Sequence, residues 1–444
     1  MTDDEHSLPS GKAVPRSRLA RAGQFGRLAG SLAGGMIAEG ARRLGQGERP
    51  KARDLLLTPG NLTRVAERLA HLRGAAMKLG QMISLDAGDF LPPELTDILA
   101  RLRSNAYHMP PPQLAGVLAA EWGKDWRRRF RRFQAHPIAA ASIGQVHRAE
   151  THDSRQLAIK VQYPGVADSI DADVDNVAAL LRASGLLPRD LDIAPLLEEA
   201  KAQLAREADY RREGEQMERF RALLAGEDAF VVPELDGEFT TSRVLAMTFL
   251  ESRPIESLET APPEDRDRQM ERLIRLVLRE LFEFGAMQTD PNFANYRVMA
   301  DGRLALLDFG ATQEVGAEVQ AGYRRLLTAG LERDEAALTS GAVEAGFLGA
   351  AAAERHPEAL GRMIAIILHE LHRSGPFDFG DRAFLTTVRE EGLKIAADKA
   401  SWHLPPAGLL FVQRKISGTA LLAARLKARV DVRALVARQL GLSA

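Results

Sequence analysis

Cysteine is absent from this sequence, which excludes disulfide bonds and thiolate metal sites and fits a reducing compartment. The ten histidines are scattered and form no H-E-x-x-H pattern, so no zinc site is expected. No uninterrupted apolar run approaches the roughly 20 residues of a membrane-spanning helix. A net charge of −1 offers no general attraction to nucleic acid, and none is expected as a partner. The start, Met1 to Glu5, is too acidic for a signal or transit peptide. These absences favour a cytoplasmic protein.

The composition is that of a globular protein, with 45% apolar and 27% charged residues. A chain of 444 residues is too long for one simple core, so two lobes with extensions are expected.

One short stretch carries the clearest chemistry. Asp290 is followed five residues later by Asn295, and an apolar run over 304–307 then leads to Asp308-Phe309-Gly310. This layout is typical of protein-kinase-like phosphotransferases. Mg²⁺ prefers hard oxygen ligands, which the carboxylate of Asp308 and the amide of Asn295 would supply. Asp290 would accept or orient the proton of an attacking hydroxyl.

A second Asp-Phe-Gly stands at residues 378–380, without an Asp-x4-Asn pair before it and with proline and glycine nearby. We interpret this copy as a structural loop rather than a metal site.

An alanine-rich stretch before a predicted hairpin suggests a nucleotide loop. Compared with the kinase pattern G-x-G-x-x-G-x-V, only Gly144 and Val146 match, and alanines replace the first two glycines. Two strands follow, over 146–149 and 157–161, and the second carries Ala158-Ile159-Lys160. A lysine in this position binds the α- and β-phosphates of ATP in kinases. The loop residues expected to contact nucleotide are Ala139, Ala140, Ala141, Ser142, Gly144 and Val146.

A kinase lysine needs a carboxylate partner on a neighbouring helix. One long helix is predicted over 194–224, containing Glu207, Asp209 and Glu213. Glu207 and Asp209 lie two residues apart and point to different faces, so both cannot serve one partner. We expect Glu207 to pair with Lys160, although a surface pair with Arg211 would also satisfy it.

Other segments complete the prediction. Strands over 230–233 and 243–249 would close a small antiparallel sheet, and residues 249–252 would form an adenine-binding hinge. A long amphipathic helix is predicted before Asp290, and the segment after Gly310 is predicted to be helical. The predicted helices cover 265–286, 317–330, 334–345, 353–372, 383–397 and 406–440.

The N-terminal region contains two further patterns. Gly26, Gly30 and Gly34 share one helix face and are flanked by arginines, which fits an interfacial membrane helix, a contact with a second copy of the chain, or a glycine-rich linker. Lys78 and Gln81 share a face of a helix predicted over 62–86. Their spacing alone favours a solvated lysine near a helix end.

With these residues in hand, the chain resembles the UbiB/AarF-domain atypical kinases, which support the biosynthesis of ubiquinone and other prenyl quinones. Lys78-Leu79-Gly80-Gln81 is similar to the K-x-G-Q signature of that family, and residues 139–142 are similar to its alanine-rich loop. Glu207-Ala208-Asp209 is similar to its E-x-D motif. The resemblance implies that Lys78 and Gln81 are site residues, with Glu207, Asp209 or Glu213 as partners.

We therefore expect an α+β, bilobal protein-kinase-like fold. The predicted parts are a disordered tail (1–20), a glycine-rich segment that associates with membranes (21–60), an N-terminal helical extension (61–130), a small antiparallel-sheet lobe (131–252) and a mainly helical lobe (253–444). The resemblance implies ATP or ADP with Mg²⁺, a lipid or prenyl-quinone precursor, quinone-biosynthesis enzymes as partners, and peripheral contact with the inner face of a membrane. The alternatives are a lipid-extracting ATPase without a phosphorylated product and a nucleotide-binding pseudokinase scaffold.

Overall fold

The computed structural model describes residue 42, residues 108–183 without 142, and residues 194–442 without 402 and 404. The described chain forms two compact units. The first contains the described residues up to Glu215 together with Glu234–Phe249, and the second contains Gln216–Pro233 and the residues from Leu250 onward. Residues 61–107 of the predicted extension, with Lys78 and Gln81, and the segment from Gly26 to Gly34 lie outside the described residues.

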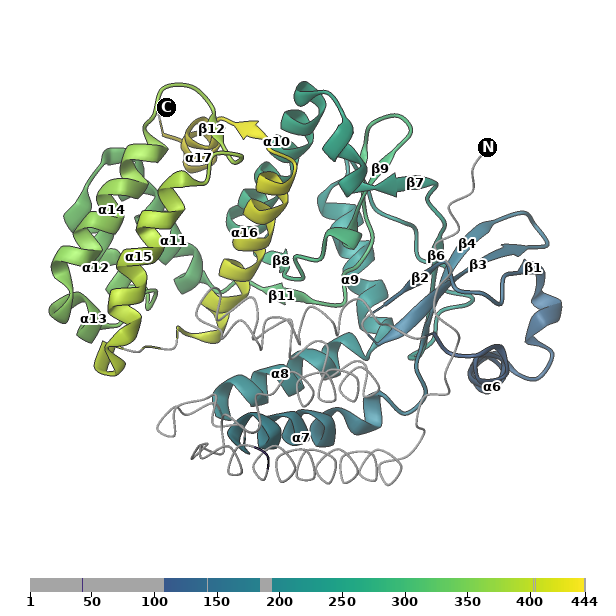
Figure 1. Ribbon diagram of the computed structural model, residues 1–444. Coiled ribbons are helices and arrows are strands. Elements are labelled where there is room, and N and C mark those ends of the chain that lie inside the picture. Colours follow the sequence, from purple (N-terminus) through teal and green to yellow (C-terminus); the bar gives the residue numbers. More distant parts are fainter. Residues whose placement is uncertain are drawn as a thin grey trace. The chain divides into compact units, whose positions relative to one another are not determined.

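The first unit contains a five-stranded sheet in the order β1-β3-β4-β6, with β2 paired to β3 (Figure 1). Every pairing is antiparallel. The hairpin predicted from the sequence is confirmed by β3 and β4, which pair from Gly144 opposite Gln162 to Glu150 opposite Gln156. The strands are β1 (Phe130–Phe133), β2 (Ala139–Ala140), β3 (Gly144–Thr151), β4 (Gln156–Gln162) and β6 (Val244–Thr248).

The first unit also contains helices, and α6 contacts β4 of this sheet. α7 and α8 contact each other, and α6 is held by an aromatic cluster in which the Trp122 ring lies 5.4 Å from Phe130 and 5.6 Å from Phe239. Trp122 Nε1 also donates to the main-chain oxygen of Phe239 at 3.0 Å. The helices are α6 (Pro111–Trp122), α7 (Ile170–Ala183), α8 (Ala194–Glu207) and the first part of α9 (Tyr210–Leu223).

The prediction of one helix over 194–224 is wrong, because the helix is interrupted at Ala208 and Asp209, between α8 and α9. The Asp209 carboxylate accepts hydrogen bonds from the main-chain nitrogens of Arg211 and Arg212, at 3.1 and 3.2 Å. Aspartate is favoured at a helix start because its side chain satisfies main-chain donors there. Asp209 therefore begins a new helix instead of continuing the old one.

The second unit has a four-stranded sheet in the order β5-β10-β9-β7. Its β5 pairs in parallel with β10, so the expectation that 230–233 and 243–249 share one sheet is wrong. A separate antiparallel pair, β8 with β11, lies beside the Asp290 loop. The strands are β5 (Phe230–Val231), β7 (Ser252–Pro254), β8 (Ala286–Gln288), β9 (Tyr296–Met299), β10 (Leu304–Leu306), β11 (Thr312–Glu314), β12 (Phe377–Asp378) and β13 (Arg429–Val430).

The rest of the second unit is helical. α10 continues into a π-helical turn, Glu280–Phe284, which ends at Gly285 with a left-handed backbone. The helices predicted over 353–372 and 406–440 are each divided, the second by β13. The helices are α10 (Pro263–Arg279), α11 (Ala317–Glu332), α12 (Glu335–Glu344), α13 (Ala350–Arg355), α14 (Pro357–Leu371), α15 (Ala383–Ala397), α16 (Ala407–Arg425) and α17 (Val432–Leu440).

One hydrophobic cluster connects α10, α11 and α16 through Val277, Leu281, Tyr323, Leu409 and Val412. Figure 1 shows α16 running beside α10. This packing brings α16 close to the β8–β11 pair, because Met287 and Val315 belong to the same cluster. The predicted α+β class, with a small antiparallel sheet and a mainly helical second part, is confirmed. Within the described residues, no helix is both long and apolar enough to cross a bilayer.

Candidate functional site

The loop between β8 and β9 carries Asp290 and Asn295. Its start is fixed by Thr289, whose hydroxyl donates to the main-chain oxygen of Ala311 at 2.7 Å. Asn292 caps the short helix that ends at Asn295, because its Oδ1 accepts from the nitrogen of Ala294 at 3.1 Å. Asn295 Nδ2 in turn donates to the main-chain oxygen of Asp290 at 3.4 Å. That bond orients the Asn295 amide and makes Oδ1 the atom suited to a cation.

Asp308 follows β10 and is held by its own turn. Its Oδ1 accepts a hydrogen bond from the nitrogen of Gly310 at 3.0 Å. The nitrogen of Leu307 donates to the main-chain oxygen of Asn295 at 3.1 Å, so the chain before Asp308 is tied to the Asn295 loop. Phe309 is 2% exposed and lies 5.1 Å, between ring centroids, from Phe220 of α9. Burial of this phenylalanine fixes the turn and with it the position of Asp308.

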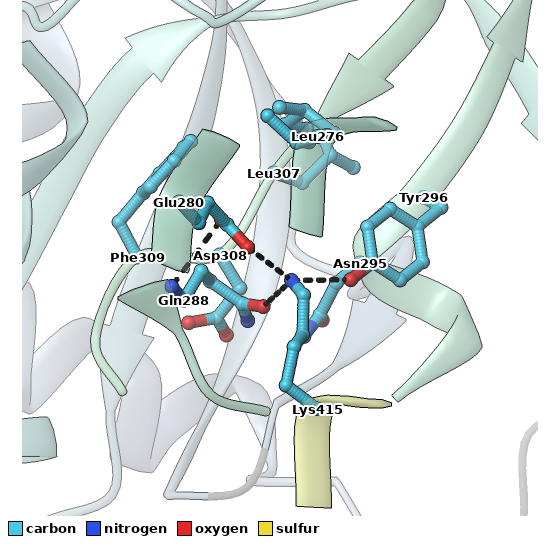
Figure 2. A pocket seen from close by; sticks show the side chains of 10 residues that line it. Leu276, Glu280, Gln288, Asn295, Tyr296, Leu307, Asp308, Phe309 and Lys415 are labelled. Carbon is cyan, nitrogen blue, oxygen red and sulfur yellow. Dashed lines mark hydrogen bonds and ion pairs between the residues drawn. The ribbon is translucent and has the colours of Figure 1, made fainter. Parts of the chain in front are cut away.

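Asn295 and Asp308 line one small pocket, which Figure 2 shows. The structure thus brings together the two residues expected to bind metal. Asp290 is half-buried at the start of the same loop and does not line this pocket. Its Oδ1 accepts from the nitrogen of Asn292 at 3.3 Å. A carboxylate and an amide carbonyl in one pocket are ligands of the kind that Mg²⁺ prefers.

Lys160 of β4 forms a buried ion pair in the first unit. Its Nζ lies 2.8 and 2.9 Å from the two carboxylate oxygens of Glu213 on α9, and 5.1 Å from the ring centre of Tyr210. The expectation that Glu207 is the partner is therefore wrong. Glu207 ends α8 and accepts from Gln203 Nε2 at 3.2 Å. Because a second helix begins after Asp209, Glu207 and Glu213 lie on different helices. The prediction of which carboxylates share a face assumed one continuous helix and therefore does not apply.

The alanine stretch forms a tight hairpin with β3. Ala139 pairs with Val146 and Ala140 with Gln145, while the nitrogen of Ala141 donates to the oxygen of Gly144 at 2.9 Å. Ala139 and Ala140 are exposed. Gly144 is buried, and a Cβ there would lie 2.5 Å from the oxygen of Val161. The glycine permits a close approach of the backbone, and contact of this loop with nucleotide stays a prediction. Ser142, Lys78 and Gln81 lie outside the described residues.

The second Asp-Phe-Gly lies in the small β12–β13 pair. Asp378 Oδ1 accepts from the nitrogen of Gly380 at 2.8 Å, as Asp308 does from Gly310. Its other oxygen lies 3.8 Å from Nε of Arg429. The two tripeptides share a local turn, but only Asp308 lies with Asn295 in the pocket.

Sequence reasoning missed four polar residues of the pocket: Glu280, Gln288, Tyr296 and Lys415. Lys415 is 2% exposed, and its Nζ donates to Gln288 Oε1 at 3.0 Å and Tyr296 Oη at 2.8 Å. It also lies 3.3 Å from a carboxylate oxygen of Glu280. Burial is the largest single influence and lowers the pKa of Lys415, but the charges and hydrogen bonds of Glu280 and Tyr296 together outweigh it and raise that pKa overall. The signal in the sequence was a lysine at helical spacing from the apolar Val412 and Leu422.

The sequence of this chain is similar to those of known atypical kinases. A family model, the ABC1 atypical kinase-like domain, matches residues 101–341. The mitochondrial atypical kinase COQ8 of Saccharomyces cerevisiae is 36% identical over 425 residues, covering 94% of this chain and 84% of the yeast protein. The mitochondrial atypical kinase COQ8B of Rattus norvegicus is 36% identical over 425 residues, covering 95% and 80%.

A solved Mycobacterium tuberculosis protein, described as a complex with erythromycin, matches 84% of this chain and 94% of its own at a TM-score of 0.58. Its identity of 24% supports a shared fold alone. The family model and the curated relatives cover the ion pair, the Asp290 loop and the Asp308 turn. The chain therefore belongs to the ABC1 atypical kinase-like family.

Proposed function

We propose that this protein binds Mg²⁺ with ATP or ADP and is an ATP-dependent phosphotransferase or ATPase. The observation that carries the proposal is the shared pocket of Asn295 and Asp308, with Asp290 at the start of the same loop. Mg²⁺ bound by these two residues would offset phosphate charge, and Asp290 would accept or orient the proton of an attacking hydroxyl. The buried Lys160–Glu213 pair supplies a fixed cation for phosphate oxygens.

A role in ubiquinone biosynthesis follows from the family resemblance, and the yeast and rat relatives are named mitochondrial atypical kinases. The acceptor we propose is small or lipid-linked, such as a prenyl-quinone precursor. The intact set of Lys160, Asp290, Asn295 and Asp308 favours an active site over a pseudokinase scaffold. An ATPase that moves lipid intermediates without forming a phosphorylated product remains the second candidate.

Asp308→Asn and Asp378→Asn form a matched pair for testing the metal site. Both aspartates accept a hydrogen bond from the glycine two residues later, so the local cost of the change is comparable. A neutral amide cannot replace the carboxylate beside triphosphate charge. We expect Mg-ATP to raise the melting temperature of the wild type and of Asp378→Asn, but not of Asp308→Asn. If Mg-ATP raised the melting temperature of Asp308→Asn but not of Asp378→Asn, the metal site would belong to the second Asp-Phe-Gly and not to the first.

The acceptor is tested by following ATP turnover with and without vesicles and prenylphenol lipids. A labelled lipid product formed together with ADP supports the phosphotransferase, whereas release of inorganic phosphate without a labelled lipid supports the ATPase. Vesicle co-sedimentation before and after removal of residues 1–45 tests membrane contact through Gly26, Gly30 and Gly34. Each arginine near an anionic surface contributes about 1 kcal/mol, so added salt should weaken sedimentation. Equal sedimentation of the full and shortened chains would contradict membrane contact through this segment.

A further inference from the structure

Helix α16 reaches the pocket that contains Asn295 and Asp308. This helix spans Ala407–Arg425 and therefore lies beyond residue 341, where the family-model match ends. Figure 2 shows the Lys415 side chain extending from α16 to the side chains of Glu280, Gln288 and Tyr296. A charged side chain so deeply buried needs a specific reason, because burial of an ammonium is unfavourable unless its donors are satisfied.

Lys415 holds both ends of the loop that carries Asp290 and Asn295. Gln288, its first partner, is the last residue of β8, and Tyr296, its second, is the first residue of β9. The loop of residues 289–295 lies between them. An ammonium group has three donors, and here they face Gln288, Tyr296 and Glu280. One cation from a distant helix thus fixes where the loop begins and where it ends.

Gly418 provides a second contact one turn further along α16. A Cβ at this position would lie 2.0 Å from Cβ and 3.3 Å from Cα of Pro291. Real side chains do not approach so closely, so only glycine allows the helix backbone to pack on the residue next to Asp290. Residues three apart on a helix share a face, which places Lys415 and Gly418 together toward the loop.

We propose that Lys415 and Gly418 are positioning residues for phosphoryl transfer, and that α16 sets the place of the Asp290 loop. This inference rests on the proposed function. Transfer depends on placement of the reacting groups to a fraction of an ångström, so a small shift of Asp290 lowers turnover. Nucleotide binding draws on the loop only through Asn295, because the other expected metal ligand, Asp308, lies in a turn that is held by Gly310 and Phe309. The expected signature is a loss of kcat with retained nucleotide affinity.

Three variants of the full chain test the role. Gly418→Ala adds one methyl group against Pro291. Gly361→Ala on α14 is its control, because a Cβ there meets nothing within 4 Å. The double variant Lys415→Met with Glu280→Gln removes the ammonium without leaving a buried carboxylate unpaired, which keeps the chain folded. Each protein is measured for kcat and KM of Mg-ATP turnover, for the Kd of Mg-ADP and for its melting temperature.

We expect kcat to fall about tenfold or more in Gly418→Ala and in the double variant, with the Kd of Mg-ADP within about twofold of the wild type. Gly361→Ala should have the kcat and the Kd for Mg-ADP of the wild type. Wild-type kcat in both test variants would overturn the positioning role. So would a parallel loss of affinity, kcat and melting temperature, because it indicates a structural role only. Absence of turnover in the wild-type chain would instead refute the proposed function, and the positioning role with it.

Discussion

Lys160 and Glu213 form a bidentate ion pair whose side chains are only 7% and 1% exposed. Removing one partner of such a pair leaves an uncompensated buried charge, at a cost of about 3–5 kcal/mol. Glu213→Gln should therefore lower the free energy of unfolding by that order, measured by urea denaturation. Adding Lys160→Met to Glu213→Gln should recover much of the loss, because the buried ammonium group is then removed as well.

A double-mutant cycle separates the two candidate partners. The coupling energy between Lys160 and Glu213 should exceed about 1 kcal/mol, and that between Lys160 and Glu207 should be smaller. A larger coupling with Glu207 would restore the pairing that the sequence suggested.

The part of the site that depends on near neighbours in the chain could be predicted. Asp290 and Asn295 share one loop, and a short strand leads to Asp308, so spacing and residue type were sufficient. Lys160 was found in the same way, because a hairpin places it on a strand. These relationships depend on local geometry, which motif spacing encodes.

The remainder depends on long-range packing. Helical periodicity alone predicted one helix over 194–224, but the capping side chain of Asp209 starts a second helix there. As a result, the carboxylate that pairs with Lys160 is that of Glu213 and not that of Glu207. β5 does not lie in the same sheet as β6, as the sequence predicted, but pairs in parallel with β10. No local sequence pattern specifies this pairing. Lys415 meets Gln288 from 127 residues away. Only the tertiary fold brings such residues together, and a lone lysine in a helix is most often a solvated one.

Gly144→Ala should destabilise the first unit. The added Cβ would lie 2.5 Å from the oxygen of Val161 and 2.7 Å from Oη of Tyr210. A backbone oxygen within a paired strand cannot move aside easily, and overpacking of this kind costs about 1–3 kcal/mol. Gly116→Ala in α6 is the control, because nothing lies within 4 Å of its Cβ position and a helix gains about 1 kcal/mol from the change. Equal stability of the two variants in urea denaturation would contradict the close approach.

Ala139→Gly and Ala141→Gly should change nucleotide preference more than stability. Losing one methyl group frees the backbone, at a folding cost of about 0.5–1 kcal/mol. A more flexible hairpin would allow the phosphates of the bound nucleotide to take a second position. The ratio of ATP to ADP affinity should therefore shift, and self-phosphorylation should rise. Ala351→Gly, at an exposed position in α13, controls for the backbone effect. Unchanged affinities and unchanged radiolabel incorporation in both loop variants would mean that the hairpin is only structural.

His147 predicts how stability depends on pH. Its side chain is fully buried in β3, and burial lowers its pKa from 6.5 to about 4. The hydrogen bonds require a neutral ring. Gln145 Oε1 accepts from the nitrogen of Met109, so its Nε2 donates to His147 Nε2 at 2.9 Å. The other ring nitrogen, Nδ1, donates to the oxygen of Gln134 at 2.8 Å. A protonated ring would set a donor against a donor at Nε2.

The sign of the effect follows from these two pKa values. Between pH 6.5 and about 4 the unfolded chain binds a proton that the folded chain does not, so stability is full above pH 6.5 and is lost as the pH falls. The full loss amounts to about 3 kcal/mol, at up to about 1.4 kcal/mol per pH unit. Urea denaturation from pH 7 to pH 4.5 should show this slope in the wild type and a shallower one in His147→Gln. His152→Gln on the same hairpin, where the ring is exposed, controls for removing an imidazole from this sheet. If the slope of His147→Gln equals that of the wild type, the buried imidazole is not the group that titrates.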